Sequence, residues 1–162
     1  MRDLRKEFVD SNKGDVDVKI FINKEGYYVM CPYGRSPIKK WIGMAKLNYF
    51  LTGDYRHDRE ETIVENIIDC INVGINYDKM GIEKNNDDDI ATAFLKEAKK
   101  DNYDKFHVIS IDLSDLSDEI QVVGWERVGN RGNEWRGKPD SAINISYEEF
   151  ETTVMKAINS FI

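Results

Sequence analysis

The sequence predicts an α+β domain in which helices cover a mainly antiparallel sheet. Apolar residues alternate at period two in DVDVKIFI, the pattern of a strand with one buried face, and KFHVISIDLS and EIQVVGWERVG have the composition of strands. Apolar residues recur at helical spacing in the segments that begin at residues 58 and 146. The order of a hairpin, then helices, then strands and a last helix implies an α+β domain. We expect one domain over residues 1–162, with about five strands and about four helices.

The first two elements predicted are a short helix and a β-hairpin. Residues 3–11 place Leu4 and Phe8 on one side of a helix that stops near a glycine. Residues 15–22 put valines and isoleucines on one face, and the turn NKEG leads into the apolar residues 27–31. This arrangement predicts two antiparallel strands joined by a tight turn.

Two longer helices are predicted next. In residues 36–53, Pro37 suits the first helical position and apolar residues follow at helical spacing, although a glycine and several aromatics also permit a strand. In residues 58–75, Asp58 and Glu61 have the spacing of a capping box, and isoleucines run down one face. We expect both segments to pack on the sheet.

The second half of the chain predicts two helices and three strands. Aspartates before residues 90–100 and lysines at their end suit the dipole of a helix. Residues 105–114 and 119–129 have the composition of strands joined by a turn, and a brief strand follows at 142–145. Residues 146–162 begin with a capping box and carry an apolar face, which predicts a closing helix.

Composition and charge limit the classes of partner and the compartment. The chain has a net charge of -7, with 41% hydrophobic and 33% charged residues. An acidic average field repels nucleic acid and anionic lipid, so neither is the expected partner. The two cysteines, Cys31 and Cys70, suit neither a disulfide framework nor a metal knuckle, and we expect small buried hydrophobes in a reducing compartment. With no signal peptide or membrane span in the sequence, we expect a cytoplasmic protein.

The stretch GWERVGNRGNEWRGKPD, residues 124–140, is the most unusual in the chain. Its glycines lack the spacing of a phosphate-binding loop and are not followed by a helix, so a long hairpin loop or a bulged strand end is the simplest interpretation. Trp135 and Arg136 are residue types enriched at binding hot spots, which makes them candidate anchors for a protein partner. Stacking of a single-stranded nucleic acid on the tryptophans runs against the acidic charge.

The sequence shows no catalytic or metal-binding constellation. His57 lies among acidic residues, but a zinc or acid-base site needs several convergent groups and one other histidine, His107, is present. Pro139 and Asp140 resemble the start of a restriction-type nuclease motif, but no acid-x-Lys triplet follows. We therefore assign no catalytic residue, no metal and no cofactor.

The size, the acidity, the α+β composition and the closing segment INISYEEFETTVMKAINSFI resemble the small immunity proteins of bacterial polymorphic-toxin and contact-dependent growth-inhibition systems. This is a resemblance of class and not of motif, so no residue role carries over from it. It implies a cytoplasmic protein that binds a cognate toxin domain, often a nuclease, and blocks its active site or substrate groove.

A nuclease presents a basic groove, so acidic residues are the expected contacts of such an inhibitor. The candidate partner-binding residues are Asp54, Asp58, Glu60, Glu61, Asp87, Asp88, Asp89, Asp112, Asp115, Asp118, Trp135 and Arg136. Of these, we expect Asp112, Asp115 and Asp118 on the turn between two strands. The simplest alternative is that these charges only keep the domain solvated.

Other functions remain open at this point. One is a phage or mobile-element inhibitor of a host defence enzyme. Another is a nucleic-acid-associated accessory protein that uses Arg35, Lys39, Lys40 and the loop at residues 124–138. An enzyme of unfamiliar type would need a deep pocket with perturbed carboxylates, for example around Glu126.

Overall fold

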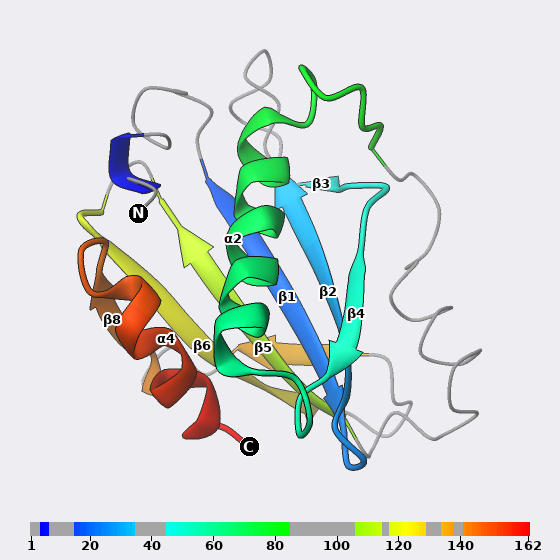
Figure 1. Cartoon of the computed structure of the whole chain (residues 1–162), viewed down its shortest axis with the longest axis vertical. Coiled ribbons are helices and arrows are strands. Elements are labelled where there is room, and N and C mark those ends of the chain that lie inside the picture. The colour runs from blue at the N-terminus through cyan, green and yellow to red at the C-terminus, as the bar shows by residue number, and fades with distance from the viewer. Residues whose placement is uncertain are drawn as a thin grey trace.

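A computed structural model describes residues 4–6, 15–34, 45–84, 106–114, 117–128, 134–137 and 141–162 (Figure 1). The elements are, in chain order, β1 (Val16–Asn23), β2 (Tyr27–Gly34), β3 (Ala45–Lys46), β4 (Leu51–Asp54), α2 (Glu60–Asn76), β5 (Phe106–Leu113), β6 (Glu119–Val128), β7 (Glu134–Gly137), β8 (Ile143–Ser146) and α4 (Phe150–Asn159). Residues 4–6 are also helical. None of the helices in these ranges is long and apolar enough to cross a membrane.

The strands form an eight-stranded sheet in which all pairings are antiparallel. β1 lies between β2 and β5, and β6 follows β5. At one end of the sheet β3 and β4 both pair with β2, and at the other end β7 and β8 both pair with β6. The predicted antiparallel α+β architecture is confirmed, and the described chain has more strands than expected because β3, β4 and β7 add to the predicted strands.

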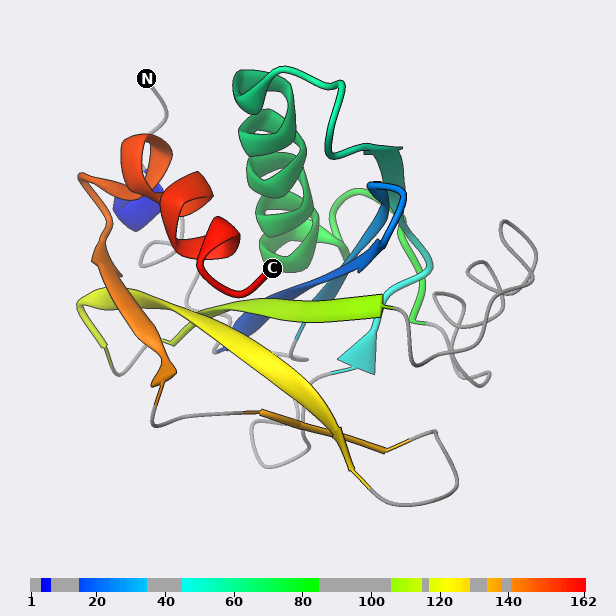
Figure 2. The ribbon, with the colours of Figure 1, turned by 90° about the horizontal axis from the view of Figure 1, so that it is seen from below.

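Both α2 and α4 lie on one face of the sheet, as the view from below shows (Figure 2). Alternation along β1 turns Val16, Val18, Ile20 and Ile22 toward the helices, where they join the main core. The opposite face carries a smaller cluster that includes Phe21. The helix-covered face of the sheet therefore carries the main core, and the second face carries a smaller apolar cluster.

The predicted β1–β2 hairpin, the helix α2, the strands β5, β6 and β8 and the closing helix are confirmed. Gly26 occupies the turn between β1 and β2 with a φ of 95°, a backbone conformation that L-residues with a side chain rarely adopt. In α4 the expected face is buried, with Phe150 and Val154 fully inaccessible to solvent. Ser146 Oγ accepts a hydrogen bond from the Glu149 amide in the turn before α4. The predicted capping box is wrong, because the N-cap of the helix is Glu149 and it makes no side-chain capping hydrogen bond.

The helix predicted over residues 36–53 is wrong for the residues that the structure describes. Ala45–Lys46 and Leu51–Asp54 are strands paired with β2. Leu47 is buried and Tyr49 and Leu51 are half-buried, while the residues between them are exposed, which is an alternation at period two. The prediction of a helix rested instead on the helical spacing of other apolar residues in the segment. Pairing with the free edge of β2 satisfies backbone groups that would otherwise be exposed at a sheet edge, so tertiary context decides this segment. The predicted helix at residues 90–100 lies outside the described residues.

The unusual stretch at residues 124–140 is a hairpin in its described parts. β6 and β7 pair antiparallel, with Trp125 opposite Gly137 and Arg127 opposite Trp135. The hairpin interpretation is thus confirmed, and the loop between the two strands lies outside the described residues.

Candidate functional site

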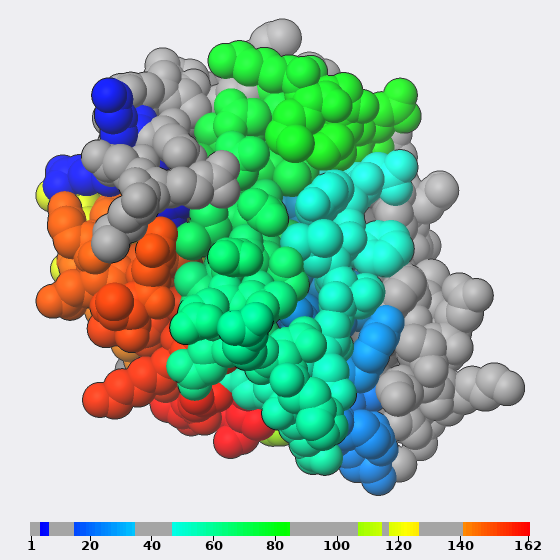
Figure 3. Space-filling view, in the orientation of Figure 1, coloured from blue at the N-terminus to red at the C-terminus, as the bar shows by residue number. Residues whose placement is uncertain are grey.

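The candidate site is a groove between the two helices on the covered face of the sheet. One side of α2 is buried against the sheet, and the helix is held there by residues such as Ile67 and Ile71, both 0% exposed. α4 packs beside it through Phe150 and Ile158. In the space-filling view the surfaces of the two helices meet along a seam on this side of the molecule (Figure 3).

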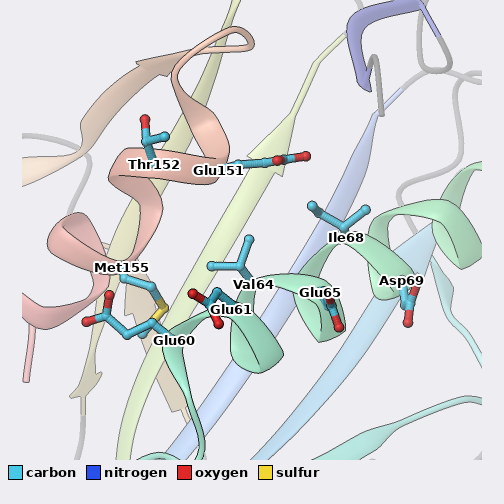
Figure 4. Close-up of a pocket in the computed structure, with 9 residues that line it drawn as sticks. All are labelled: Glu60, Glu61, Val64, Glu65, Ile68, Asp69, Glu151, Thr152 and Met155. Carbon is cyan, nitrogen blue, oxygen red and sulfur yellow. The ribbon is translucent and has the colours of Figure 1, made fainter. Parts of the chain in front are cut away.

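The α2–α4 groove has a volume of about 550 Å³. Its apolar floor consists of Val64, Ile68 and Met155, which are 8%, 5% and 6% exposed. Figure 4 shows Glu151 extending from α4 across toward α2. The groove is lined by Glu60, Glu61, Val64, Glu65, Ile68, Asp69, Glu151, Thr152 and Met155. The lining therefore combines five carboxylates with apolar groups and includes no basic side chain.

The spacing of the acids on α2 is energetically unfavourable for the helix itself. Glu61, Glu65 and Asp69 stand four residues apart, so each neighbouring pair is a like-charge contact that costs about 0.2 to 0.5 kcal/mol. Glu60 and Glu61 are in the first turn, where the helix dipole favours negative charge. Glu65 and Asp69 lie beyond that turn and gain nothing from it. Glu61, Glu65 and Glu151 form no ion pair within the described part of the chain.

The start of α2 is fixed by Asp58, but not through the predicted capping box. The N-cap is Arg59, and it makes no side-chain capping hydrogen bond. Asp58 Oδ2 instead accepts hydrogen bonds from the Asp54 amide at 3.1 Å and from the Tyr28 hydroxyl at 3.3 Å. Asn66 Nδ2 donates to the same hydroxyl oxygen at 2.9 Å. The carboxylate thus joins β4, β2 and α2, which is a structural use of this side chain.

Gly53 is required where these groups converge. A Cβ atom at this position would lie 2.4 Å from Tyr28 Oη and 2.5 Å from Asp58 Oδ2. The absence of a side chain therefore allows β4 to approach the network closely.

Asp54 closes the turn that follows β4. Its Oδ1 accepts hydrogen bonds from the amides of Arg56 at 2.9 Å and His57 at 3.3 Å, and its Oδ2 lies 2.7 Å from His57 Nδ1. The hydrogen bond with the His57 ring, followed by that from the Arg56 amide, lowers the pKa of the Asp54 carboxyl. The bond from the Arg56 amide to the Asp54 carboxylate two residues earlier makes this an Asx-type turn. Both the Asp54 and the His57 side chains are exposed, so the turn lies on the surface.

The remaining candidates that the structure describes lie on different elements. Asp112 lies within β5, not in the turn between strands, and it is half-buried on the face opposite the helices. Asp118 is exposed and pairs with Arg5 at 2.8 Å. Trp135 and Arg136 belong to β7, of which the structure describes the backbone pairing with β6. Asp87, Asp88, Asp89 and Asp115 lie outside the described residues.

Of the twelve candidates, Glu60 and Glu61 line the groove. The sequence-based selection missed Glu65, Asp69 and Glu151. The four-residue spacing of Glu61, Glu65 and Asp69 was the signal that could have identified the stripe on α2. Glu151 could not be found this way, because its place beside α2 depends on how α4 packs.

The described residues contain no group of three or more side chains suited to hold a metal ion. Cys31 and Cys70 are both buried, as expected, and no disulfide bond joins them. Burial raises the pKa of the Cys70 thiol, so this sulfur is held in its unreactive protonated form. His107 is exposed on β5.

Comparisons with known proteins show a similarity of fold. No protein-family model matches the sequence, and no curated protein matches it. Among solved structures, a protein of unknown function from Neisseria meningitidis is similar, with a TM-score of 0.59 and 10% sequence identity. The similarity covers 93% of this chain and 98% of that one. At this identity it concerns the architecture alone.

Proposed function

We propose that the protein is an immunity-type inhibitor that binds a basic toxin domain, of the nuclease type, through the α2–α4 groove and blocks its active site or substrate groove. The observation that carries the proposal is the combination in this groove of five carboxylates with an apolar floor. Lysine and arginine side chains match such a surface, because their apolar stems cover hydrophobic atoms while their charged ends reach the acids. The residues of a nuclease that contact phosphate are of these types.

The cost of the acidic stripe on α2 supports the same proposal. The four-residue spacing of Glu61, Glu65 and Asp69 is unfavourable on a solvated face, because neighbouring like charges destabilise the helix. A basic partner removes this repulsion on binding and is attracted at long range by the field of the stripe. The partner would therefore associate rapidly and in a salt-dependent way.

The test is co-expression with the product of the neighbouring gene, followed by measurement of growth and of the affinity of the purified pair. We expect relief of toxicity and a dissociation constant that rises with salt. The groove variant Glu61→Gln/Glu65→Gln/Glu151→Gln is expected to weaken binding on the order of tenfold to a hundredfold.

The matched control is Glu25→Gln/Glu83→Gln/Glu148→Gln, which changes the net charge equally at exposed positions outside the groove. It is expected to change affinity less than about threefold. Equal weakening by both triple variants would show that net charge, not the groove, attracts the partner. Binding of a generic oligonucleotide in place of a protein would contradict the proposal.

A further inference from the structure

On the face of the sheet away from the helices, two aspartates stand directly opposite each other. Asp17 of β1 pairs with Asp112 of β5 in the antiparallel register. Val16 and Val18 on either side of Asp17 belong to the helix-covered core, so alternation places Asp17 and its partner on the other face. Side chains opposite each other in such a pair have Cβ atoms about 4.5 to 5.5 Å apart, and like charges there are destabilising.

Burial makes this juxtaposition more costly. Both aspartates are half-buried. Asp112 Oδ1 is shielded from solvent and has no hydrogen-bond partner among the described residues. Two ionised carboxylates at this separation repel each other strongly where water is excluded, and a single shared proton removes the repulsion and supplies a hydrogen-bond donor.

The cation near the pair, Lys19, contacts two aromatic rings. Lys19 Nζ lies 4.6 Å from the centre of the Tyr33 ring and 4.8 Å from that of Trp125, so its ammonium group sits between two aromatic faces. Lys19 forms no ion pair with any described carboxylate. Trp125 is fixed in place because its Nε1 donates a hydrogen bond to Ser110 Oγ at 2.8 Å.

Other titratable groups near the pair are few in the described part of the chain. Asp15 precedes β1, Tyr33 of β2 stands opposite Asp17, and Glu119 begins β6 two residues from Gln121, the partner of Asp112. On β3, Lys46 stands opposite Tyr33 in the register. Asp15 adds to the negative charge around the pair, and Lys19 opposes it.

We propose that Asp17 and Asp112 hold one proton between them at neutral pH, and that its loss is a pH-sensitive switch for the contact of Lys19 with Tyr33 and Trp125. Burial, followed by the charge of Asp112, raises the pKa of Asp17 to about 8. Burial also raises the pKa of Asp112. Both carboxyl groups thus favour the protonated form, and the single proton belongs to the pair, with one carboxyl donating a hydrogen bond to the other.

The switch follows from the charge on the pair. With one proton bound, the two carboxyl groups carry a single negative charge, and Lys19 remains over the aromatic rings. When the proton dissociates to solvent, the doubled charge attracts the ammonium group away from Tyr33 and Trp125. This site lies on the opposite face of the sheet from the α2–α4 groove and does not depend on the proposed function.

The first test is a carbon NMR titration of the aspartate carboxyl groups in the full chain from about pH 4 to pH 10. We expect one carboxyl to titrate near pH 8 in the unmodified protein, and this signal to disappear in Asp17→Asn. In Asp112→Asn, the remaining Asp17 is expected to titrate at lower pH, since the opposing charge is gone. Titration of both carboxyls below about pH 5 would overturn the proposal, as would an alkaline signal that persists in Asp17→Asn.

The second test follows Trp125 fluorescence with Trp41 and Trp135 replaced by Phe. We expect a change in emission with a midpoint near that of Asp17. Lys19→Met is expected to abolish the fluorescence change while the alkaline carboxyl titration persists. A fluorescence change that survives in Lys19→Met would show that the lysine is not the moving group, and would overturn that part of the switch.

Discussion

The two faces of the sheet carry the same chemical group in opposite settings. In the α2–α4 groove, glutamates stand at the surface above an apolar floor. On the other face, Asp17 and Asp112 are opposed across two strands and half-buried. The surface carboxylates are the contacts that we propose for a basic partner, whereas the half-buried pair retains a proton and carries less charge than its composition implies. A count of acidic residues therefore overstates the charge on the face that carries Asp17 and Asp112, whereas on the helix-covered face it leads to the groove that we propose as the docking surface.

The largest expected effect is a loss of stability when α4, which forms one side of the groove, loses its anchor in the core. Phe150 is 0% exposed and anchors α4 to the core. Phe150→Ala leaves a cavity and is expected to lower the free energy of unfolding by about 3 to 5 kcal/mol, measured by denaturant titration. Ile162→Ala, at a residue that is 49% exposed, is the control and is expected to change stability by less than about 0.5 kcal/mol. Equal effects would show that α4 is not anchored as described.

The second prediction concerns the buried pair and the dependence of stability on pH. The pKa of Asp17 is raised from 3.8 to about 8, so between these values the folded state binds more protons than the unfolded state. Its contribution to stability is complete below the unfolded value and is lost as the pH rises through the folded value. We expect the free energy of unfolding to fall on the order of 3 kcal/mol between about pH 5 and pH 9.

Asp17→Asn keeps the shape of the side chain and removes its ionisation. In this variant, most of that decline should be absent, and the protein should be more stable than the parent at pH 9. Denaturant titrations at several pH values measure both quantities. A parallel decline in the two proteins would assign the pH dependence to other groups.

The third prediction separates a structural carboxylate from those of the groove. Asp58→Ala removes the acceptor of the Asp54 amide and of the Tyr28 hydroxyl, and is expected to cost about 1 to 3 kcal/mol of stability. Asp58→Asn retains an oxygen acceptor and should cost less. If Asp58→Ala leaves the thermal midpoint unchanged but weakens partner binding, its role is at the interface and not in the fold.

Local periodicity explains which elements could be predicted from the sequence. The hairpin, α2 and α4 each bury one face through residues close in the chain, so their patterns are complete within each segment. β3 and β4 could not be predicted in this way, because what makes them strands is the edge of β2. The same distinction applies to the turn before α2, where Asp58 contacts Tyr28 in preference to its own helix.

The two carboxylate sites show a similar division. The stripe of Glu61, Glu65 and Asp69 is visible in the sequence as a helical spacing. The addition of Glu151 requires the packing of α4 against α2. The opposition of Asp17 and Asp112 requires the register between β1 and β5, strands that are far apart in the chain. Features that depend on a second segment are thus the ones that sequence patterns leave undetermined.

The smallest expected effect tests whether the acidic stripe on α2 lowers the free energy of unfolding. Glu65 is exposed and stands four residues from both Glu61 and Asp69, so Glu65→Gln relieves two like-charge contacts. We expect a gain of about 0.4 to 1 kcal/mol in the free energy of unfolding at low salt, and a smaller gain at high salt because ions screen the repulsion. Glu148→Gln removes the same charge at an exposed position before α4 and should give a gain near zero. A gain in stability for Glu65→Gln together with weaker partner binding would mean that the stripe destabilises the helix but contributes to recognition of the partner. No gain, or an equal gain in Glu148→Gln, would mean that these glutamates only solvate the surface.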